Sequence, residues 1–341
     1  DGQISLFLEP SEAQIETLPA GKKPDKAAQK NKNNQTAAVF PGKPTAQEQE
    51  PVWNEKQRQA IESIQRVTVV KAGPGTGKTG TLAAHILHLL ETRRVNPFCI
   101  TAVTFTNQAA NELKERIQRQ LGKRQARKLQ IGSFHSIAWK LLKDKGMEFS
   151  LAGEMETRGL VEKIRKQYSL KQSVSQLLTE ISRRKTGMCE PNSGLDEMAF
   201  EAYQKNLREW GALDFDDILL EALRIAQEEN EESGKRGSTN PFSYLLVDEF
   251  QDINPLQYRL VIEWNKRGRE LFVIGDQDQA IYGFRGADAS CFQKLTEDYS
   301  EICQIVLEEN YRSTPQILSI AAQIISKNPG GKRGLHPNRQ N

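Results

Sequence analysis

A glycine-rich segment between residues 72 and 79 carries the clearest chemical signal in the sequence. It reads Ala72-Gly-Pro-Gly-Thr-Gly-Lys-Thr79 and follows a short β-branched run, Val67–Val70. Glycines let backbone N–H groups turn toward phosphate oxygens, and a helix starting at the end of the segment adds positive potential there. The sequence therefore predicts a phosphate-binding loop made by Gly73, Pro74, Gly75, Thr76, Gly77, Lys78 and Thr79.

Two side chains at the end of this loop have predicted chemical roles. Lys78 would neutralise the β- and γ-phosphates of ATP, and the Thr79 hydroxyl would bind Mg²⁺. The strict pattern begins with glycine, whereas this chain has Ala72, which is small enough to keep the turn. A glycine-rich turn without function is a weak alternative, because the strand, the loop and the helix occur in the required order.

An acidic pair, Asp248 and Glu249, follows the apolar run Tyr244–Val247. In an open α/β sheet, ligands bind at the carboxyl ends of the strands. Asp248 would hold Mg²⁺, and Glu249 would orient or deprotonate the attacking water. Taken alone, the pair could equally be two solvated acids at a strand end; the phosphate loop favours the catalytic interpretation.

Short buried strands must position these side chains. Apolar runs at 67–70, 98–105, 244–247, 271–274 and 305–307 alternate with helical patterns such as 79–90 and 108–121. This alternation predicts an α/β fold with a parallel sheet. Residues 137–213 are charged and predominantly helical in pattern, which predicts a helical insertion. Scattered basic residues there, such as Arg183–Lys185, are interpreted as a solvated face.

Composition narrows the class of protein further. The chain has 341 residues, about two domains, with a net charge of +3, too small to indicate a nucleic-acid partner by itself. No apolar run approaches the ~18 residues of a membrane span. Four well-separated cysteines fit a reducing cytoplasm. Residue 1 is Asp, which suggests a fragment, and residues 1–50 are polar and interpreted as a disordered linker.

An ordered series of motifs over about residues 52–320 resembles the superfamily 1 DNA helicases of the UvrD/Rep type. The series adds six further segments to the phosphate loop and the acidic pair. They are Trp53–Ala60, Thr104–Leu113, Gly132–Ser136, Asp214–Asp217, Gly275–Ala287 and Asn310–Ser313. The resemblance implies a RecA-like P-loop NTPase domain (51–136 and 214–306), a helical insertion (137–213) and the start of a second RecA-like domain (307–341).

The resemblance also implies roles for individual residues in nucleotide binding. Gln57 would read the adenine edge, on which Tyr311 would stack. Gln279 would sense the γ-phosphate and couple it to DNA. Arg312 would stabilise the charge of the transition state, as an arginine finger does.

For single-stranded or partly duplex DNA, the resemblance implies stacking or backbone contacts. The implied residues are Thr104, Phe105, Asn107, His135, Tyr282, Phe284 and Arg285. Base stacking on aromatic rings is worth ~1–3 kcal/mol per base and tolerates any sequence. Phe105 could instead be an ordinary core aromatic. Many relatives have Trp at the position of Phe284, which predicts weaker stacking there.

The resemblance predicts ATP-dependent 3′→5′ translocation on DNA in repair, recombination or replication. The chain ends soon after Asn310–Ser313, so we expect it to bind nucleotide and DNA weakly but not to unwind. Two other classes remain open: a P-loop kinase or GTPase for a small substrate, and a non-catalytic DNA- or clamp-binding module.

A separate apolar island, Gln3-Ile-Ser-Leu-Phe7, interrupts the polar N-terminal stretch. It resembles the pentapeptide by which many bacterial proteins bind the replication sliding clamp. Leu6 and Phe7 would fill an apolar pocket and Gln3 would hydrogen-bond at its rim, with the linker providing reach. Chance is an equally good explanation of so short a motif.

Overall fold

The structure is a computed structural model that describes residues 52–188, 196–231, 240–283, 286–288, 290–327 and 334–338. Three predictions fall outside these ranges: the clamp-like peptide with Gln3, Leu6 and Phe7, the linker at 1–50, and the DNA contacts of Phe284 and Arg285. Among the described residues, every helix is too short or too polar to span a lipid bilayer.

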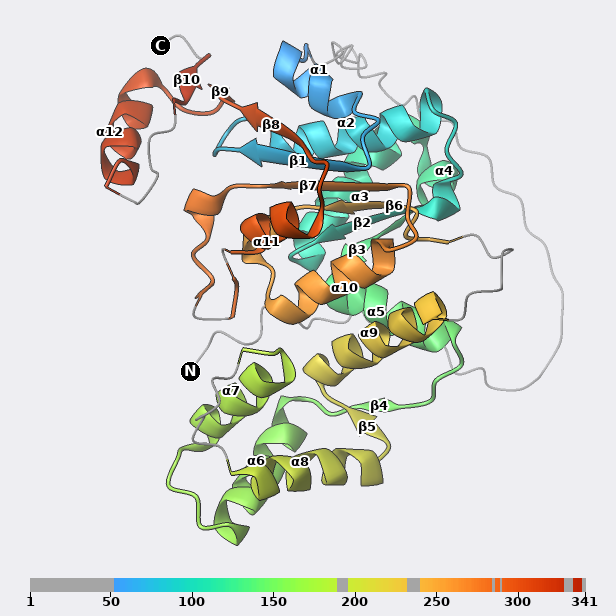
Figure 1. Cartoon of the computed structure of the whole chain (residues 1–341), viewed down its shortest axis with the longest axis vertical. Coiled ribbons are helices and arrows are strands. Elements are labelled where there is room, and N and C mark those ends of the chain that lie inside the picture. Colours follow the sequence, from blue (N-terminus) through green and yellow to red (C-terminus); the bar gives the residue numbers. More distant parts are fainter. Residues whose placement is uncertain are drawn as a thin grey trace, which may run out of the picture. The chain divides into compact units, whose positions relative to one another are not determined.

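A six-stranded parallel sheet forms the centre of the described chain (Figure 1). The strand order is β3-β2-β6-β7-β1-β8, and each neighbouring pair runs in parallel. The strands are β1 (Val67–Ala72), β2 (Ile100–Thr104), β3 (Gln130–Ser133), β6 (Tyr244–Val247), β7 (Glu270–Gly275) and β8 (Cys303–Leu307). The predicted parallel α/β fold is confirmed, with β3 as a strand that the apolar pattern did not reveal.

Both faces of the sheet are buried, which explains the near-continuous apolar strands. Successive side chains point to opposite faces. Val69 accordingly joins one hydrophobic cluster and Val70 the other, and Leu245 and Leu246 divide in the same way. One face packs against α1 (Glu55–Ile61), α2 (Lys78–Glu91), α3 (Asn107–Leu121) and α4 (Lys123–Ala126). The other packs against α5 (Phe134–Asp144), α9 (Phe215–Glu231), α10 (Pro255–Asn265) and α11 (Cys291–Asp298).

The second strand is shorter than its apolar pattern suggests. Pro97–Cys99 forms a 3₁₀ turn, and the strand begins at Ile100 rather than at Phe98. The side chain of Asn96 accepts a hydrogen bond from the backbone N–H of Phe98 and so caps the turn. Two further 3₁₀ turns, Phe250–Asp252 and Gln277–Gln279, follow β6 and β7.

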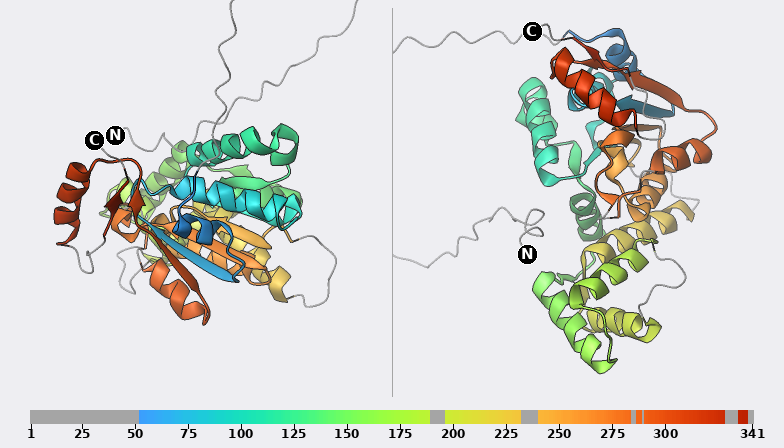
Figure 2. Two further views of the ribbon diagram at one scale, coloured as in Figure 1. Left: turned by 90° about the horizontal axis from the view of Figure 1, so that it is seen from above. Right: turned by 90° about the vertical axis from the view of Figure 1, so that its left-hand side faces the viewer.

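A third hydrophobic cluster lies between Ala152 and Ala212. It is formed by α6 (Glu154–Gln167), α7 (Val174–Lys185) and α8 (Glu197–Glu209), which pack on one another (Figure 2). The short parallel pair β4 (Ser150–Leu151) and β5 (Ala212–Leu213) joins its two ends. The buried residues of α5 belong instead to the sheet's core, although α5 overlaps the range 137–213.

The chain after the sheet forms β9 (Glu309–Asn310), α12 (Pro315–Ile325) and β10 (His336–Pro337). β9 and β10 pair in parallel. Most of α12 is exposed, and Leu318 is its one buried residue. The division of the chain into two RecA-like parts and an insertion stays a prediction.

Candidate nucleotide site and DNA-facing edge

The glycine-rich loop connects β1 to the N-terminus of α2, as the motif requires. Gly75 and Gly77 have φ values of +70° and +87°, a region that side chains with a Cβ rarely adopt. Thr76 Oγ1 donates a hydrogen bond to the Gly73 carbonyl at 2.8 Å, and Gln57 Nε2 donates one to the Thr76 carbonyl at 3.0 Å. The sequence therefore forms a fixed loop at a helix N-terminus, where anions bind.

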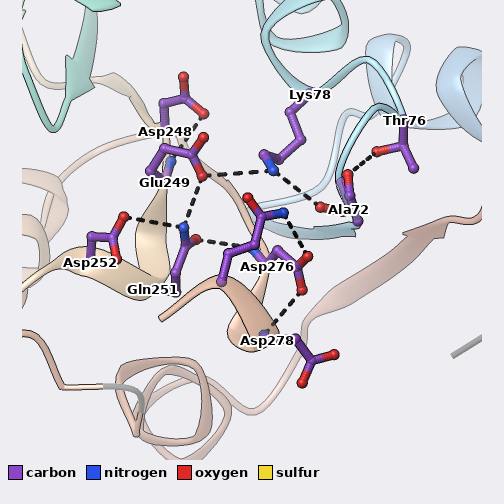
Figure 3. A network of polar contacts seen from close by, with 11 residues as sticks. Ala72, Thr76, Lys78, Asp248, Glu249, Gln251, Asp252, Asp276 and Asp278 are labelled. Atoms are coloured by element: carbon purple, nitrogen blue, oxygen red, sulfur yellow. Dashed lines mark hydrogen bonds and ion pairs between the residues drawn. The ribbon is translucent and has the colours of Figure 1, made fainter. Parts of the chain in front are cut away.

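Lys78 extends from the first turn of α2 toward the acidic pair (Figure 3). Its Nζ lies 3.4 Å from the Ala72 carbonyl and 3.8 Å from Glu249 Oε2. Both contacts are long for an ammonium group, whose charge-assisted hydrogen bonds are normally 2.7–2.9 Å. The lysine thus lies between the loop and the acids, and neither holds it tightly.

The acidic pair follows β6 at the carboxyl edge of the sheet. Asp248 is buried, and its Oδ1 accepts a hydrogen bond from the Glu249 N–H at 3.0 Å. Burial, with the negative charge of Glu249, raises the pKa of Asp248 to about 7. Glu249 has φ +48°, an uncommon conformation for a residue with a side chain, and such strain concentrates at functional sites.

Gln251 links this pair to the end of β7. Its Nε2 donates to Glu249 Oε2 at 2.9 Å and to Asp252 Oδ2 at 3.3 Å, while its Oε1 accepts from the Asp276 N–H at 2.9 Å. A Cβ on Gly275 would lie 2.4 Å from that Oε1, so the close approach requires glycine. Neither Gln251 nor Asp276 was predicted as a site residue, although Asp276 lies in the segment Gly275–Ala287 and Gln251 follows the acidic pair by two residues.

The network continues to Gln279. Its Nε2 donates to Asp276 Oδ2 at 2.8 Å, and Asp276 is buried. A continuous set of polar contacts therefore runs from Lys78 through Glu249, Gln251 and Asp276 to Gln279. Figure 3 labels the first four of these residues. We call this set of five residues the polar relay.

Asp252 borders the polar relay and has one carboxylate oxygen that is not hydrogen-bonded to any described residue. Burial, together with the charge of Glu249, raises its pKa to about 6. Its Oδ1 is buried and has no hydrogen-bond partner among the described residues. An oxygen in that state is available to a cation or to a donor on a ligand.

The segment Asn310–Ser313 packs on the phosphate loop although it lies more than 230 residues away in the sequence. The Tyr311 N–H donates to the Gly75 carbonyl at 2.9 Å, and Asn310 Nδ2 donates to the Pro74 carbonyl at 2.5 Å. A Cβ on Gly75 would lie 2.7 Å from Arg312 Cβ. The structure thus brings Tyr311 and Arg312 to the loop, as their predicted roles require.

The predicted adenine contact, Gln57, lies under the same loop. It forms a capping box with Asn54: the Gln57 N–H donates to Asn54 Oδ1 at 2.8 Å, and Gln57 Oε1 accepts from the Asn54 N–H at 3.0 Å. Asn54 Nδ2 also donates to the hydroxyl of Tyr311 at 2.8 Å. Gln57 and Tyr311 are therefore joined through Asn54.

The carboxyl ends of β2, β3 and β7 bring together the predicted DNA contacts that the structure describes. The rings of Phe105 and Tyr282 stack with centroids 5.2 Å apart, and both are half-buried. Neither ring belongs to a hydrophobic cluster of the described chain, which argues against the core interpretation of Phe105. Asn107 Oδ1 accepts from Ser133 Oγ at 2.7 Å, and the Thr104 hydroxyl donates to the Thr106 carbonyl.

His135 stands at the start of α5 and contacts the ring of Phe215 edge-on at 5.7 Å. Burial lowers its pKa to about 4, so the imidazole is neutral at pH 7. In the chain without ligand, a neutral imidazole therefore lies at this edge of the sheet.

The acidic segment Asp214–Asp217 lies elsewhere, at the start of α9. Lys185 Nζ lies 2.6 Å from Asp214 Oδ2 and 2.7 Å from Asp217 Oδ1, and the Tyr203 hydroxyl donates to Asp214 Oδ2 at 2.8 Å. The interpretation of Lys185 as part of a solvated face is wrong. Lys185 follows Leu177 and Ile181 at intervals of four residues, so it lies on the buried face of α7.

Comparison with known proteins places this chain in a family. Residues 53–300 match the UvrD/REP helicase N-terminal domain. The chain is 33% identical over 302 residues to the ATP-dependent DNA helicase PcrA of Staphylococcus epidermidis (strain RP62A) and to the PcrA of Staphylococcus aureus (strain Mu50). The chain belongs to the UvrD/REP helicase family. The alignment covers 83% of this chain but 41% of each relative, so the chain spans less than half of their length.

Membership in the UvrD/REP family confirms the resemblance that the motif series indicated. It also removes the alternative of a kinase or GTPase for a small substrate, since the match extends across β1–β7 and the helices α6–α8 together. The roles of individual site residues stay predictions. Their positions are consistent with two neighbouring surfaces, one for nucleotide and one for an extended ligand beside Phe105 and Tyr282.

Proposed function

We propose that this chain is the nucleotide-binding portion of an ATP-dependent DNA helicase that translocates 3′→5′ on single-stranded DNA. The observation that carries the proposal is the polar relay, which extends from the phosphate loop to the 3₁₀ turn containing Gln279. Three residues after Gln279 comes Tyr282, whose ring stacks on Phe105. Loss of the γ-phosphate could thereby shift the proposed DNA contact, because only a few hydrogen bonds and three residues of chain separate the two.

The chemistry of the donors fits ATP with Mg²⁺. The Thr79 hydroxyl and the Asp248 carboxylate would hold the ion, which supplies charge neutralisation at the β- and γ-phosphates. No cluster of three His, Cys, Asp or Glu side chains suited to a metal occurs in the described ranges. Mg²⁺ bound beside a nucleotide takes most of its ligands from phosphates and water, so two protein oxygens would be enough.

The remaining residues have separable roles in this proposal. Glu249 would accept a proton from the attacking water, while Lys78 and Arg312 would stabilise negative charge on the phosphates. Gln57 keeps one N–H and one oxygen lone pair outside its capping box, and these match the N7 acceptor and the N6 donor of adenine. Tyr311 would stack on the base.

Coupling between the two surfaces tests this proposal. The affinity of the 341-residue chain for labelled single-stranded DNA is measured with and without a non-hydrolysable ATP analogue and Mg²⁺, and nucleotide affinity with and without DNA. We expect each ligand to change the affinity of the other by the same factor, about fivefold or more, because coupling of binding is reciprocal. Gln279→Ala should abolish that factor but preserve nucleotide affinity.

Turnover is measured in the same samples beside Lys78→Ala and Glu249→Gln, each expected to remove any DNA-stimulated hydrolysis. A nucleotide affinity that is the same with and without DNA would overturn the proposal. DNA binding without nucleotide binding would instead support a non-catalytic binding module. The failure of these 341 residues to unwind DNA by themselves, the clamp contact through residues 3–7, the pathway and the cytoplasmic location remain predictions from the sequence.

A further inference from the structure

A basic surface covers the end of α3 and the short helix α4. Leu113 and Ile117 face the core, whereas the cations between and after them face outward. Gly122, with φ +77°, ends α3 and lets the chain turn into α4. The exposed cations, which we call the α3–α4 basic surface, are Arg116, Arg119, Lys123, Arg124, Arg127 and Lys128.

None of these six side chains forms an ion pair with another described residue. None of them lies within 4.0 Å of a carboxylate in the described part of the chain, whereas many other surface cations do. Lys294, for example, is 2.6 Å from Asp288, and Arg224 Nε is 2.8 Å from Glu221. Glu112 and Glu115 precede Arg116 and Arg119 by four residues on α3. In residues 123–128, however, the cations have only like charges at spacings of three and four residues, which repel by ~0.2–0.5 kcal/mol per pair.

The charge is also concentrated relative to the whole protein. Residues 114–128 contain seven basic side chains and one acidic one, a net charge of +6. The whole chain has a net charge of +3, so the remaining residues together are net negative. A local positive field on an otherwise acidic molecule is the electrostatic signature of a surface for a polyanion.

The α3–α4 basic surface lies away from the proposed DNA contacts at the carboxyl edge. Asn107 begins α3 at that edge, and Arg119 follows twelve residues later, about 18 Å along the helix. Lys128 precedes β3, whose Gln130 pairs with Thr101 near the start of β2. The cations therefore lie toward the amino edge of the sheet. Phe98, 57% exposed, precedes β2 at the same edge.

We propose that the α3–α4 basic surface is a second contact for the phosphate backbone of DNA, independent of nucleotide and of base sequence. Arg and Lys on an exposed helix bind phosphate oxygens and release counterions, which gives affinity without sequence preference. The ring of Phe98, exposed at the same edge of the sheet, offers a stacking face for an unpaired base. The inference rests on the proposed function only in taking DNA as the polyanion.

Salt-dependent binding tests this inference. The anisotropy of labelled blunt duplex DNA and of labelled single-stranded DNA is followed against salt, without nucleotide, for the 341-residue chain. The test variant replaces Arg116, Arg119, Lys123 and Arg124 with Gln. The matched control replaces four cations that have acidic partners, Lys145, Arg224, Lys266 and Lys294, with Gln, so that both variants have the same net charge.

We expect the test variant to bind DNA at least about tenfold more weakly than the control near 0.1 M salt. Its slope of log affinity against log salt should be smaller by about 3 to 4, since each phosphate contact on duplex DNA contributes ~0.9. Both variants keep the lysines within residues 1–51, so any contribution of these lysines to DNA affinity cancels when the variants are compared.

Equal affinities and slopes for the two variants, on both DNAs, would overturn the inference. A loss of affinity for only the duplex or only the single-stranded DNA supports the inference and identifies which form the surface binds. Thermal unfolding of each variant checks that the fold is intact; Gln has nearly the helix propensity of Arg and Lys. Nucleotide plays no part in this measurement, so failure of ATP–DNA coupling leaves its outcome unaffected.

Discussion

Two lysine–carboxylate clusters in this molecule use the same residue types in opposite ways. One, the closed cluster, consists of Lys185, Tyr203, Asp214 and Asp217, where α7 and α8 meet the start of α9. The other, the open cluster, consists of Lys78, Asp248, Glu249 and Asp252 beside the phosphate loop. Both bury acidic groups next to one lysine, yet their hydrogen bonding differs.

In the closed cluster the charged groups satisfy one another. Lys185 contacts both carboxylates, and each aspartate accepts a hydrogen bond from the backbone N–H of the other, at 2.9 and 3.2 Å. Burial would raise the pKa of Asp214, but the Lys185 ammonium outweighs it and holds that pKa below its usual value, whereas burial and the charge of Asp214 raise the pKa of Asp217. This arrangement fixes the first turn of α9 and leaves little for a ligand to bind.

In the open cluster the charges are left incompletely compensated. Lys78 is 3.8 Å from Glu249, the pKa of Asp248 is raised to about 7, and one oxygen of Asp252 has no partner in the described chain. Buried charge without compensation is costly, so such a site is stabilised when a cation and phosphates complete it. The two clusters therefore differ in how completely their polar atoms are paired, and not in the residue types that form them.

The largest effect is expected from breaking the closed cluster. Lys185→Met removes the compensating charge and leaves two buried carboxylates, so we expect the free energy of unfolding to fall by about 3–5 kcal/mol. Urea unfolding measures the change. Lys166→Met provides the control, because Lys166 is 72% exposed and 3.3 Å from Glu162, a kind of pair worth at most ~1 kcal/mol. Similar losses of unfolding free energy in both variants would show that the closed cluster is no more important for stability than a surface ion pair.

An intermediate effect, on binding rather than stability, is expected in the open cluster. Lys78→Ala should weaken binding of the ATP analogue about 10- to 100-fold, since a hydrogen bond to a charged group contributes ~1.5–3 kcal/mol. The free energy of unfolding should change by less than ~1 kcal/mol, because the Lys78 contacts are long. Calorimetric titration and urea unfolding measure the two quantities, with exposed Lys56→Ala as control. If Lys78→Ala lowered the free energy of unfolding as much as Lys185→Met, the proposed difference between the two clusters would be wrong.

The smallest expected effect is on the pH dependence of stability near the closed cluster. Asp216 adjoins the closed cluster, and burial together with the charge of Asp214 raises its pKa to about 6. A carboxyl whose pKa is higher in the folded state binds protons more tightly there, so its contribution to stability falls as pH rises from about 4 to about 6. Asp216→Asn should flatten that part of the stability–pH curve. Parallel curves for the variant and the wild type would show that Asp216 is solvated.

Much of the site followed from local sequence. The phosphate loop needs glycine at Gly75 and Gly77 because of their positive φ, and the position of Asp248 follows from the end of an apolar strand. Such features depend on a few adjacent residues, so their spacing is visible in the chain. Lys185 was misinterpreted because an isolated pattern of charges cannot show that α7 packs this residue against α9.

The sequence by itself determined the nucleotide loop, the parallel α/β class and the family, because each depends on local patterns or on motifs in a fixed order. Tertiary structure alone decided that Asn310–Ser313 packs on the loop, that Gln251 joins two strand ends, and that one lysine is enclosed while another is left between loop and acids. These contacts join residues far apart in the chain, and their energies depend on burial, which only packing establishes.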